Sequence, residues 1–145
     1  MAMHELDEIV DVFELLGDWE QRYQYLVELG ERLAPLPREA HVEDNKVRGC
    51  MSQVWVTATP DQNEPERLRF TGDCDTSIIK GVLALLIQMA DGKTLHELDT
   101  LDVDEMFERL QLDDHLSPNR HVGVYAIVEK MKERASRALE HSSIT

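Results

Sequence analysis

The chain has 145 residues, 29 acidic and 15 basic, and its formal net charge is −14. This charge repels phosphate backbones and no lysine- or arginine-rich segment offsets it, so no nucleic-acid partner is expected. The longest apolar run, residues 81–90, is well short of the roughly 20 residues that span a bilayer, so no membrane association is expected either.

Two helices open the chain. Apolar residues recur at helical spacing over 5–16 and again over 18–33, with Gly17 between the two segments. Asp18 is the expected N-cap of the second helix. The prolines of segment 34–40 cannot continue that helix, so the pattern predicts an αα-hairpin.

Two strands follow. Residues 52–59 and 67–72 are rich in β-branched and aromatic residues and partly alternate in polarity. The segment between them, 60–66, has turn-forming composition. The pattern predicts an antiparallel hairpin, to which the residues around Val47 would add a short third strand.

A central buried helix is expected next. The segment from Asp75 to Gly92 is apolar on most faces, with Asp75 or Thr76 as the N-cap and Gly92 as the C-terminal stop. Because its apolar residues surround the helix, we expect this element to form the middle of the core.

Three more helices complete the chain, at about 94–99, at about 102–110 and from Ser117-Pro118 onward. The element order is therefore α-α-β-β-(β)-α-α-α-α. Strands that are adjacent in sequence favour a small antiparallel sheet of two or three strands with helices packed on it, an α+β domain. We expect a single domain over 1–145 with an ordered core at about 5–140.

Cys50 follows a glycine and precedes the first strand, in the sequence VRGCMSQVW (47–55). Core packing is the ordinary role of a cysteine. Here, however, Gly49 favours a tight loop and Arg48 could stabilise a thiolate. Ser52, Gln53 and the backbone amides of the turn are candidate supports for a sulfur anion. The pattern favours a reactive cysteine.

Cys74 lies where the second strand meets the central helix. The N–H groups of a helix start favour a thiolate, whereas the carboxylates of Asp73 and Asp75 oppose it. A structural thiol and a functional thiol both remain open. The two cysteines flank the hairpin and could approach each other, but no CxxC or HxxxH spacing supports a zinc site completed by histidines or Asp73.

The cysteine count also bears on the compartment. Two cysteines do not make a disulfide framework, and the first residues resemble neither a secretion signal nor an arginine-rich transit peptide. We therefore expect a cytoplasmic protein with reduced thiols.

Several segments carry a family resemblance: VRGCMSQVW (47–55), FTGDCDTSIIKGVLALL (70–86), HLSPNRHVGVYAIVEKMKERA (115–135) and DWEQRYQYLVELGERLAPLP (18–37). Together they resemble the SufE/CsdE family of sulfur acceptors for cysteine desulfurases. The resemblance covers about residues 5–139, and its most specific part is the motif GC-x-S-x-VW.

The resemblance implies a fold like that of the NifU/IscU iron–sulfur scaffolds. It also implies that Cys50 accepts persulfide sulfur from a pyridoxal-phosphate cysteine desulfurase of the SufS or CsdA type. The sulfur would then pass to iron–sulfur cluster assembly, through a SufBCD-type scaffold in the Suf case. The chain would be a covalent carrier and activator rather than an enzyme. It would hold no cofactor or metal itself, and it would act as a monomer or weak homodimer.

The chain departs from the family pattern at two places. Cys74 replaces the serine of a GDS segment, which leaves a second sulfur site, a resolving thiol or a zinc ligand open. The segment RHVG (120–123) replaces an RSQG-type segment. Of this segment only Arg120 is carried over, because His121 is unusual and Val122 replaces a polar residue. Arg120 joins Asp73 and Cys74 as a candidate auxiliary residue.

Two other functions are kept as alternatives. One is a metal-binding scaffold, for zinc or an iron–sulfur cluster, on an IscU-like fold that uses both cysteines with a histidine or aspartate. The other is an adaptor that binds the desulfurase without carrying sulfur. The sequence does not distinguish a Suf from a Csd desulfurase as the partner.

Overall fold

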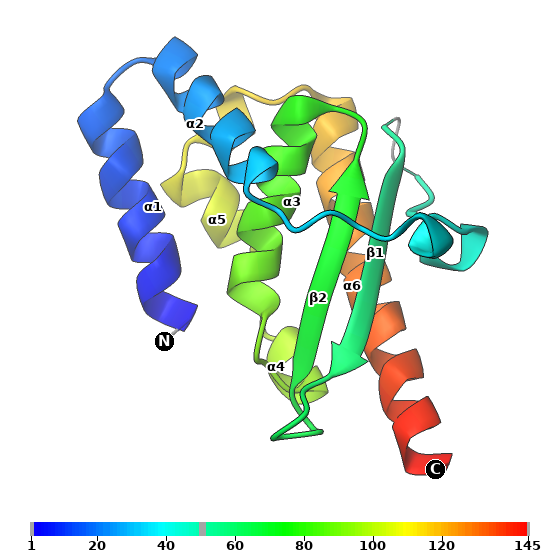
Figure 1. The fold of residues 1–145 in the computed structure, drawn as a ribbon. Coiled ribbons are helices and arrows are strands. Elements are labelled where there is room, and N and C mark those ends of the chain that lie inside the picture. Colours follow the sequence, from blue (N-terminus) through cyan, green and yellow to red (C-terminus); the bar gives the residue numbers. More distant parts are fainter. Residues whose placement is uncertain (1, 50–51, 145) are drawn as a thin grey trace.

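The main helices of this chain pack on one face of a two-stranded sheet (Figure 1). A computed structural model describes residues 2–49 and 52–144 of the chain. Its helices and strands are α1 (Ala2–Leu16), α2 (Trp19–Glu31), β1 (Val54–Pro60), β2 (Leu68–Cys74), α3 (Ser77–Ala90), α4 (Leu95–Leu98), α5 (Val103–Arg109) and α6 (Pro118–Ile144). Short 3₁₀ turns lie at η1 (Arg38–Ala40), η2 (Glu43–Asn45) and η3 (Leu112–Asp114). The expected α+β class and its order of helices and strands are confirmed. The terminal helices extend past the expected ordered core of 5–140.

Local signals set the helix boundaries. The Asp18 carboxylate accepts a hydrogen bond of 2.9 Å from the Gln21 backbone N–H, so Asp18 caps α2 as predicted. Gly17 adopts a φ of 77° in the turn before it, a conformation that costs other residues free energy. Across the described residues, no helix combines the length and apolar character required to cross a membrane.

The sheet is a single antiparallel hairpin, in which Val54 lies opposite Cys74 and Pro60 opposite Leu68. The expected third strand does not form within the described residues. An isolated bridge between Lys46 and Trp55 takes its place. The chain leaves the sheet because Gly49, three residues later, turns with a φ of 86°.

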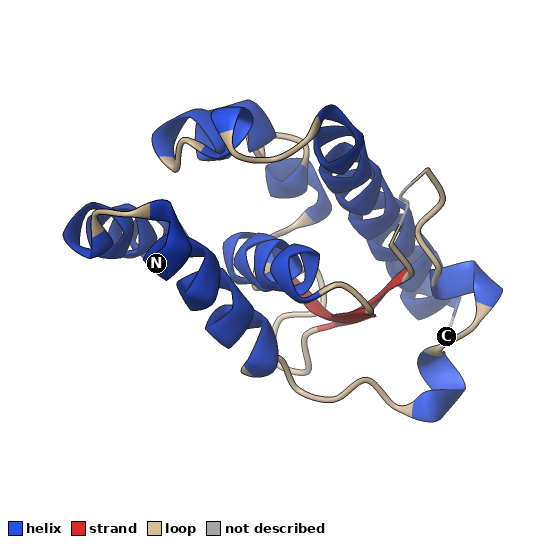
Figure 2. Ribbon diagram, turned by 90° about the horizontal axis from the view of Figure 1, so that it is seen from above, coloured by secondary structure: helices blue, strands red, loops and turns tan. Residues whose placement is uncertain are grey.

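The core lies between the hairpin and the helices. α3 and α6 pack against one face of the sheet, and α3 occupies the centre of the molecule with α1 and α2 on one side and α6 on the other (Figure 2). α2 crosses α3 closely at Gly30 and Gly81: a Cβ on Gly81 would lie 2.0 Å from the carbonyl oxygen of Leu26. The opposite face of the sheet is crossed by the segment between α2 and η2 (Figure 1).

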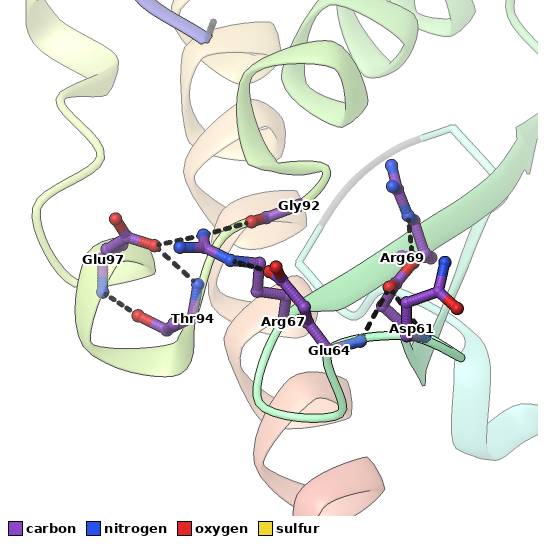
Figure 3. Close-up of polar contacts among 8 residues, drawn as sticks. Asp61, Glu64, Arg67, Arg69, Gly92, Thr94 and Glu97 are labelled. Atoms are coloured by element: carbon purple, nitrogen blue, oxygen red, sulfur yellow. Dashed lines mark hydrogen bonds and ion pairs between the residues drawn. The ribbon is translucent and has the colours of Figure 1, made fainter.

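Ion pairs close the turn end of the hairpin (Figure 3). The Arg67 guanidinium lies 2.7 Å from the Gly92 carbonyl oxygen and 3.2 Å from Glu97. Arg69 lies 3.0 Å from Asp61. These contacts join the β1–β2 turn to the connection between α3 and α4. They lie at the end of the sheet away from Val54 and Cys74, so their role is structural.

Candidate functional site

Cys50 and Met51 lie outside the described residues, and their neighbours define how the chain enters and leaves this position. We call residues 48–53 the Cys50 segment. On its first side the backbone N–H of the buried Val47 donates to the Val54 carbonyl oxygen at 2.8 Å. The Cys50 segment therefore starts and ends at the same point of the hairpin, where β1 begins and β2 ends.

Its last residues are held on the start of α3. The hydroxyl oxygens of Ser52 and Thr76 lie 2.6 Å apart, and either hydroxyl can donate. The Gln53 backbone N–H donates to the Asp75 carboxylate at 2.9 Å, and the Asp75 N–H donates to the Gln53 carbonyl oxygen at 3.1 Å. Three hydrogen bonds thus fix the C-terminal side of the Cys50 segment.

The side chains of the two residues expected to cap α3 make these hydrogen bonds instead of capping the helix. Asp75 and Thr76 were the N-cap candidates, and Thr76 does occupy the cap position. Its side chain, however, makes no capping hydrogen bond to the α3 backbone, and the Asp75 carboxylate accepts from the backbone of Gln53 instead. Both cap side chains are therefore used to hold the Cys50 segment.

The first side of the segment is open. The Arg48 side chain is 80% exposed and lies 3.5 Å from the Glu43 carboxylate, with which it forms an ion pair. Such an exposed pair contributes at most about 1 kcal/mol, so the guanidinium can exchange partners. Gly49 is exposed, and a Cβ built there would lie 3.7 Å from the Cβ of Ala126. The segment therefore begins against the side of α6.

Asp73 and Cys74 point to opposite faces of β2, because successive side chains of a strand alternate. Cys74 is 6% exposed and faces the core, where its Sγ accepts from the Thr76 N–H at 3.4 Å. Asp73 is half-buried on the outer face, 2.9 Å from His41 Nε2 and 3.3 Å from Lys80 Nζ. The auxiliary candidates Asp73 and Cys74 therefore lie on opposite faces of the hairpin.

Electrostatics stabilise the ionised His41–Asp73 pair. The hydrogen bond to Asp73 is the largest cause of a raised pKa at His41. Burial opposes ionisation of Asp73, but hydrogen bonds from His41, the Cys74 backbone and Lys80 outweigh it and lower the pKa of Asp73. The His41 ring also meets the edge of Trp55, with ring centroids 4.7 Å apart.

The metal-scaffold alternative gains no support from the part of the chain that is described. Within residues 2–49 and 52–144, no group of three or more histidine, cysteine, aspartate or glutamate side chains could hold a metal ion. The strand alternation explains this, because Cys74 faces the core while Asp73 and His41 lie on the other side of the sheet.

Arg120 and His121 open the long helix α6. Arg120 is half-buried and shares its helical face with Val124 and Ile127, which are buried in the core. Among the described residues, no ion pair joins the Arg120 guanidinium to the Cys50 segment. The unusual His121 stacks on Phe107 with ring centroids 4.8 Å apart, so it serves the packing of α5 against α6.

His41 is the site residue that sequence reasoning missed. No motif in the sequence singles out a histidine, and His41 lies 32 residues from its partner Asp73. No spacing rule connects two such positions. The only sequence signal for this contact is the pair of prolines after α2. They end the helix, and the chain then crosses the sheet, but they do not specify that His41 meets Asp73.

The fold and this segment define a small α+β domain that presents a cysteine-bearing segment at one end of a hairpin. Comparison with known proteins identifies the family: residues 7–135 match SufE, described as an Fe-S metabolism associated domain. The chain belongs to this family, and the resemblance noted from the sequence is confirmed.

Individual relatives agree. An uncharacterized SufE-like protein of Rhizobium etli is 40% identical over 136 residues, which cover 93% of this chain and 92% of that protein. One from Rhizobium meliloti is 37% identical over 139 residues, covering 94% and 99%. The solution structure of a hypothetical protein from Thermus thermophilus is similar with a TM-score of 0.72 at 20% identity, covering 94% of this chain and 96% of that one. This last likeness supports the fold alone.

Proposed function

We propose that this chain is a covalent sulfur carrier in which Cys50 accepts sulfur from a cysteine desulfurase and passes it on to iron–sulfur cluster assembly. The observation that carries the proposal is that the Cys50 segment is held by hydrogen bonds at one end and exposed at the other. Its far side is tied by Ser52 and Gln53 to the start of α3, while its near side, with Arg48 and Gly49, is exposed. A thiol on such a segment suits entry into another protein's active site.

The transfer is a substitution at sulfur. The Cys50 thiolate attacks the outer sulfur of a cysteine persulfide on the desulfurase, a new S–S bond forms at Cys50, and the desulfurase cysteine leaves as a thiolate. No net oxidation occurs. The acceptor must be ionised and accessible. Arg48 is the nearest described cation along the chain, and it is free to leave its weak pair with Glu43.

This chemistry assigns different roles to the desulfurase and to the acceptor. The desulfurase holds the pyridoxal phosphate that releases sulfur from cysteine, and the acceptor needs no cofactor of its own. The partner is a desulfurase of the SufS or CsdA type, and the recipient is a SufBCD-type scaffold. The chain acts in the cytoplasm as a monomer or weak homodimer and is not itself an enzyme.

Mass spectrometry tests the proposal directly. The full chain is incubated with cysteine and a desulfurase of each type, and its intact mass and peptides are measured. Wild type gains one or more sulfur atoms on the peptide containing Cys50, and Cys50→Ser gains none. Cys74→Ser is the matched control and gains sulfur as wild type does. Loading of Cys50→Ser at the wild-type rate would show that Cys50 is not the acceptor.

A further inference from the structure

Two of the large hydrophobic residues exposed on this protein lie together on α6. Val122 is 59% exposed and Tyr125, one turn later, is 42% exposed. The Tyr125 hydroxyl donates a hydrogen bond to Asp104 of α5, which holds the aromatic ring at the surface. A rigid exposed aromatic beside an exposed aliphatic side chain is typical of the anchor of a protein interface.

A groove continues from these residues along α6. It has a volume of about 540 Å³ and runs between the helix and the turn η2; it is lined by Glu43, Asp44, Arg48, Ala126, Glu129, Lys130 and Glu133. Figure 2 shows the short turns before β1 lying beside α6. Positions 122, 126, 129 and 133 follow the helical period, so the apolar anchor and the groove share one stripe of α6.

The groove is negatively charged. Two cations of the described chain line the groove. One of them, Lys130, is largely buried: its side chain is 11% exposed and lies 3.2 Å from Glu133, with which it forms an ion pair. Burial opposes ionisation of Glu133, but Lys130 and Arg134 outweigh it and lower its pKa. Glu129 is 77% exposed and makes a long ion pair, 3.9 Å from Lys132. Among the described lining residues, the carboxylates of Glu43 and Asp44 face one exposed cation, Arg48. This surface complements a basic partner.

The stripe is continuous with the Cys50 segment. Ala126 lines the groove and is also the residue that a Cβ on Gly49 would meet at 3.7 Å. Arg48 lines the same groove. A protein that receives the residue following Gly49 in its active site must therefore cover this part of α6.

We infer that the α6 stripe and its groove form the docking surface for the desulfurase. This inference rests on the proposed function. The segment that docks is a basic one with an apolar side chain at its end. Its apolar group covers Val122 and Tyr125, and its lysine or arginine side chains lie along Glu129 and Asp44. The acidic groove thus adds specificity and a faster encounter to a contact anchored by apolar burial.

The experiment separates docking from sulfur chemistry. Val122→Asp and Glu129→Lys are each loaded in two ways: by cysteine with a purified desulfurase, and by glutathione persulfide, which needs no docking surface. Leu15→Asp on α1 and Glu66→Lys at the hairpin turn are matched controls, because both positions are exposed and neither α1 nor this turn lines the groove among the described residues.

The two stripe variants are expected to need about tenfold more desulfurase for half-maximal loading, as for loss of an interface anchor. Glutathione persulfide loads them as fast as wild type, and the controls behave as wild type in both assays. Wild-type loading of both stripe variants by the desulfurase would overturn the docking surface. Slow loading in both assays would overturn it too, by placing the defect in the Cys50 segment. Failure of the desulfurase to load wild type would instead overturn the proposed function.

Discussion

Ser52 and Thr76 lie 24 residues apart in the sequence, and their hydroxyl oxygens are 2.6 Å apart. This contact joins the Cys50 segment to the N-cap residue of the buried helix α3. The segment is thereby fixed on one side and left open on the other, which is the arrangement that the proposed sulfur carrier requires. The predictions below test this arrangement and the packing that supports it.

Removing the Ser52 hydroxyl should loosen the segment. Ser52→Ala loses one hydrogen bond, which contributes about 0.5–1.5 kcal/mol to stability. Sulfur loading by the desulfurase should slow about two- to tenfold if the anchored conformation is the one that reacts. Hydrogen exchange of the Gln53 amide, which donates to Asp75, should become faster.

Thr57→Val is the matched control, because Thr57 makes a similar hydroxyl contact with Thr71 across the hairpin. It should leave sulfur loading unchanged. Protection of the Gln53 amide in Ser52→Ala equal to that in wild type would show that the hydroxyl pair does not hold the segment.

Gly49→Ala should impair sulfur transfer through backbone strain. Gly49 has a φ of 86°, and the nearest atom of the described residues to a Cβ built there is the Ala126 Cβ at 3.7 Å. The expected cost of an added methyl group therefore comes from the unfavourable backbone conformation. The cost is about 1–2 kcal/mol. The segment relieves it by changing conformation, and the rate of sulfur loading should fall about tenfold.

Gly17→Ala provides the control for that strain. Gly17 has a φ of 77°, and no atom of the described part of the chain lies within 4 Å of a Cβ built there, but it lies between α1 and α2. Its substitution should lower the free energy of unfolding by a similar amount, about 1–2 kcal/mol, and leave the loading rate unchanged. Equal loading rates in the two variants would contradict a specific role for Gly49.

Gly81→Ala should destabilise the fold. The new Cβ would lie 2.0 Å from the Leu26 carbonyl oxygen, so α2 must move away from α3. Overpacking of this kind costs about 1–3 kcal/mol, more than the roughly 1 kcal/mol that alanine gains over glycine in a helix. Urea unfolding measures the change. Gln88→Ala, on the exposed side of α3, should stay within about 0.5 kcal/mol of wild type.

The His41–Asp73 pair predicts a pH-dependent stability difference. The raised pKa of His41 gives a contribution that is complete below the ordinary histidine pKa and is lost as pH rises through the folded pKa. The lowered pKa of Asp73 keeps the carboxylate ionised down to acid pH. The difference in Tm between wild type and His41→Gln should therefore be larger at about pH 5.5 than at about pH 9.

His96→Gln is the control for this effect, because His96 is exposed on α4 with no ion pair among the described residues. Its difference in Tm from wild type should change less between the two pH values. A His41→Gln difference that is constant across this range, or that grows with pH, would mean that the pair does not stabilise the folded state.

The elements of the fold were predictable because their signals are local. The Asp18 cap, the helix break at Gly17 and the alternation in β1 and β2 each depend on residues within a few positions, and all appear where the sequence predicts them. The Cys50 motif was also visible as a pattern. The identity of the family follows from that pattern and is supported by the match over residues 7–135.

The arrangement of the site was decided by tertiary packing. The hairpin register places Val54 opposite Cys74, and only this pairing brings Ser52 to Thr76. It also sends Asp73 and Cys74 to opposite faces of the hairpin, so two auxiliary candidates that are adjacent in sequence have different surroundings. Short-range backbone preferences determine which segments are helix or strand, whereas contacts between distant residues depend on which faces become buried together, and that was settled when α2, α3 and α6 packed around the hairpin.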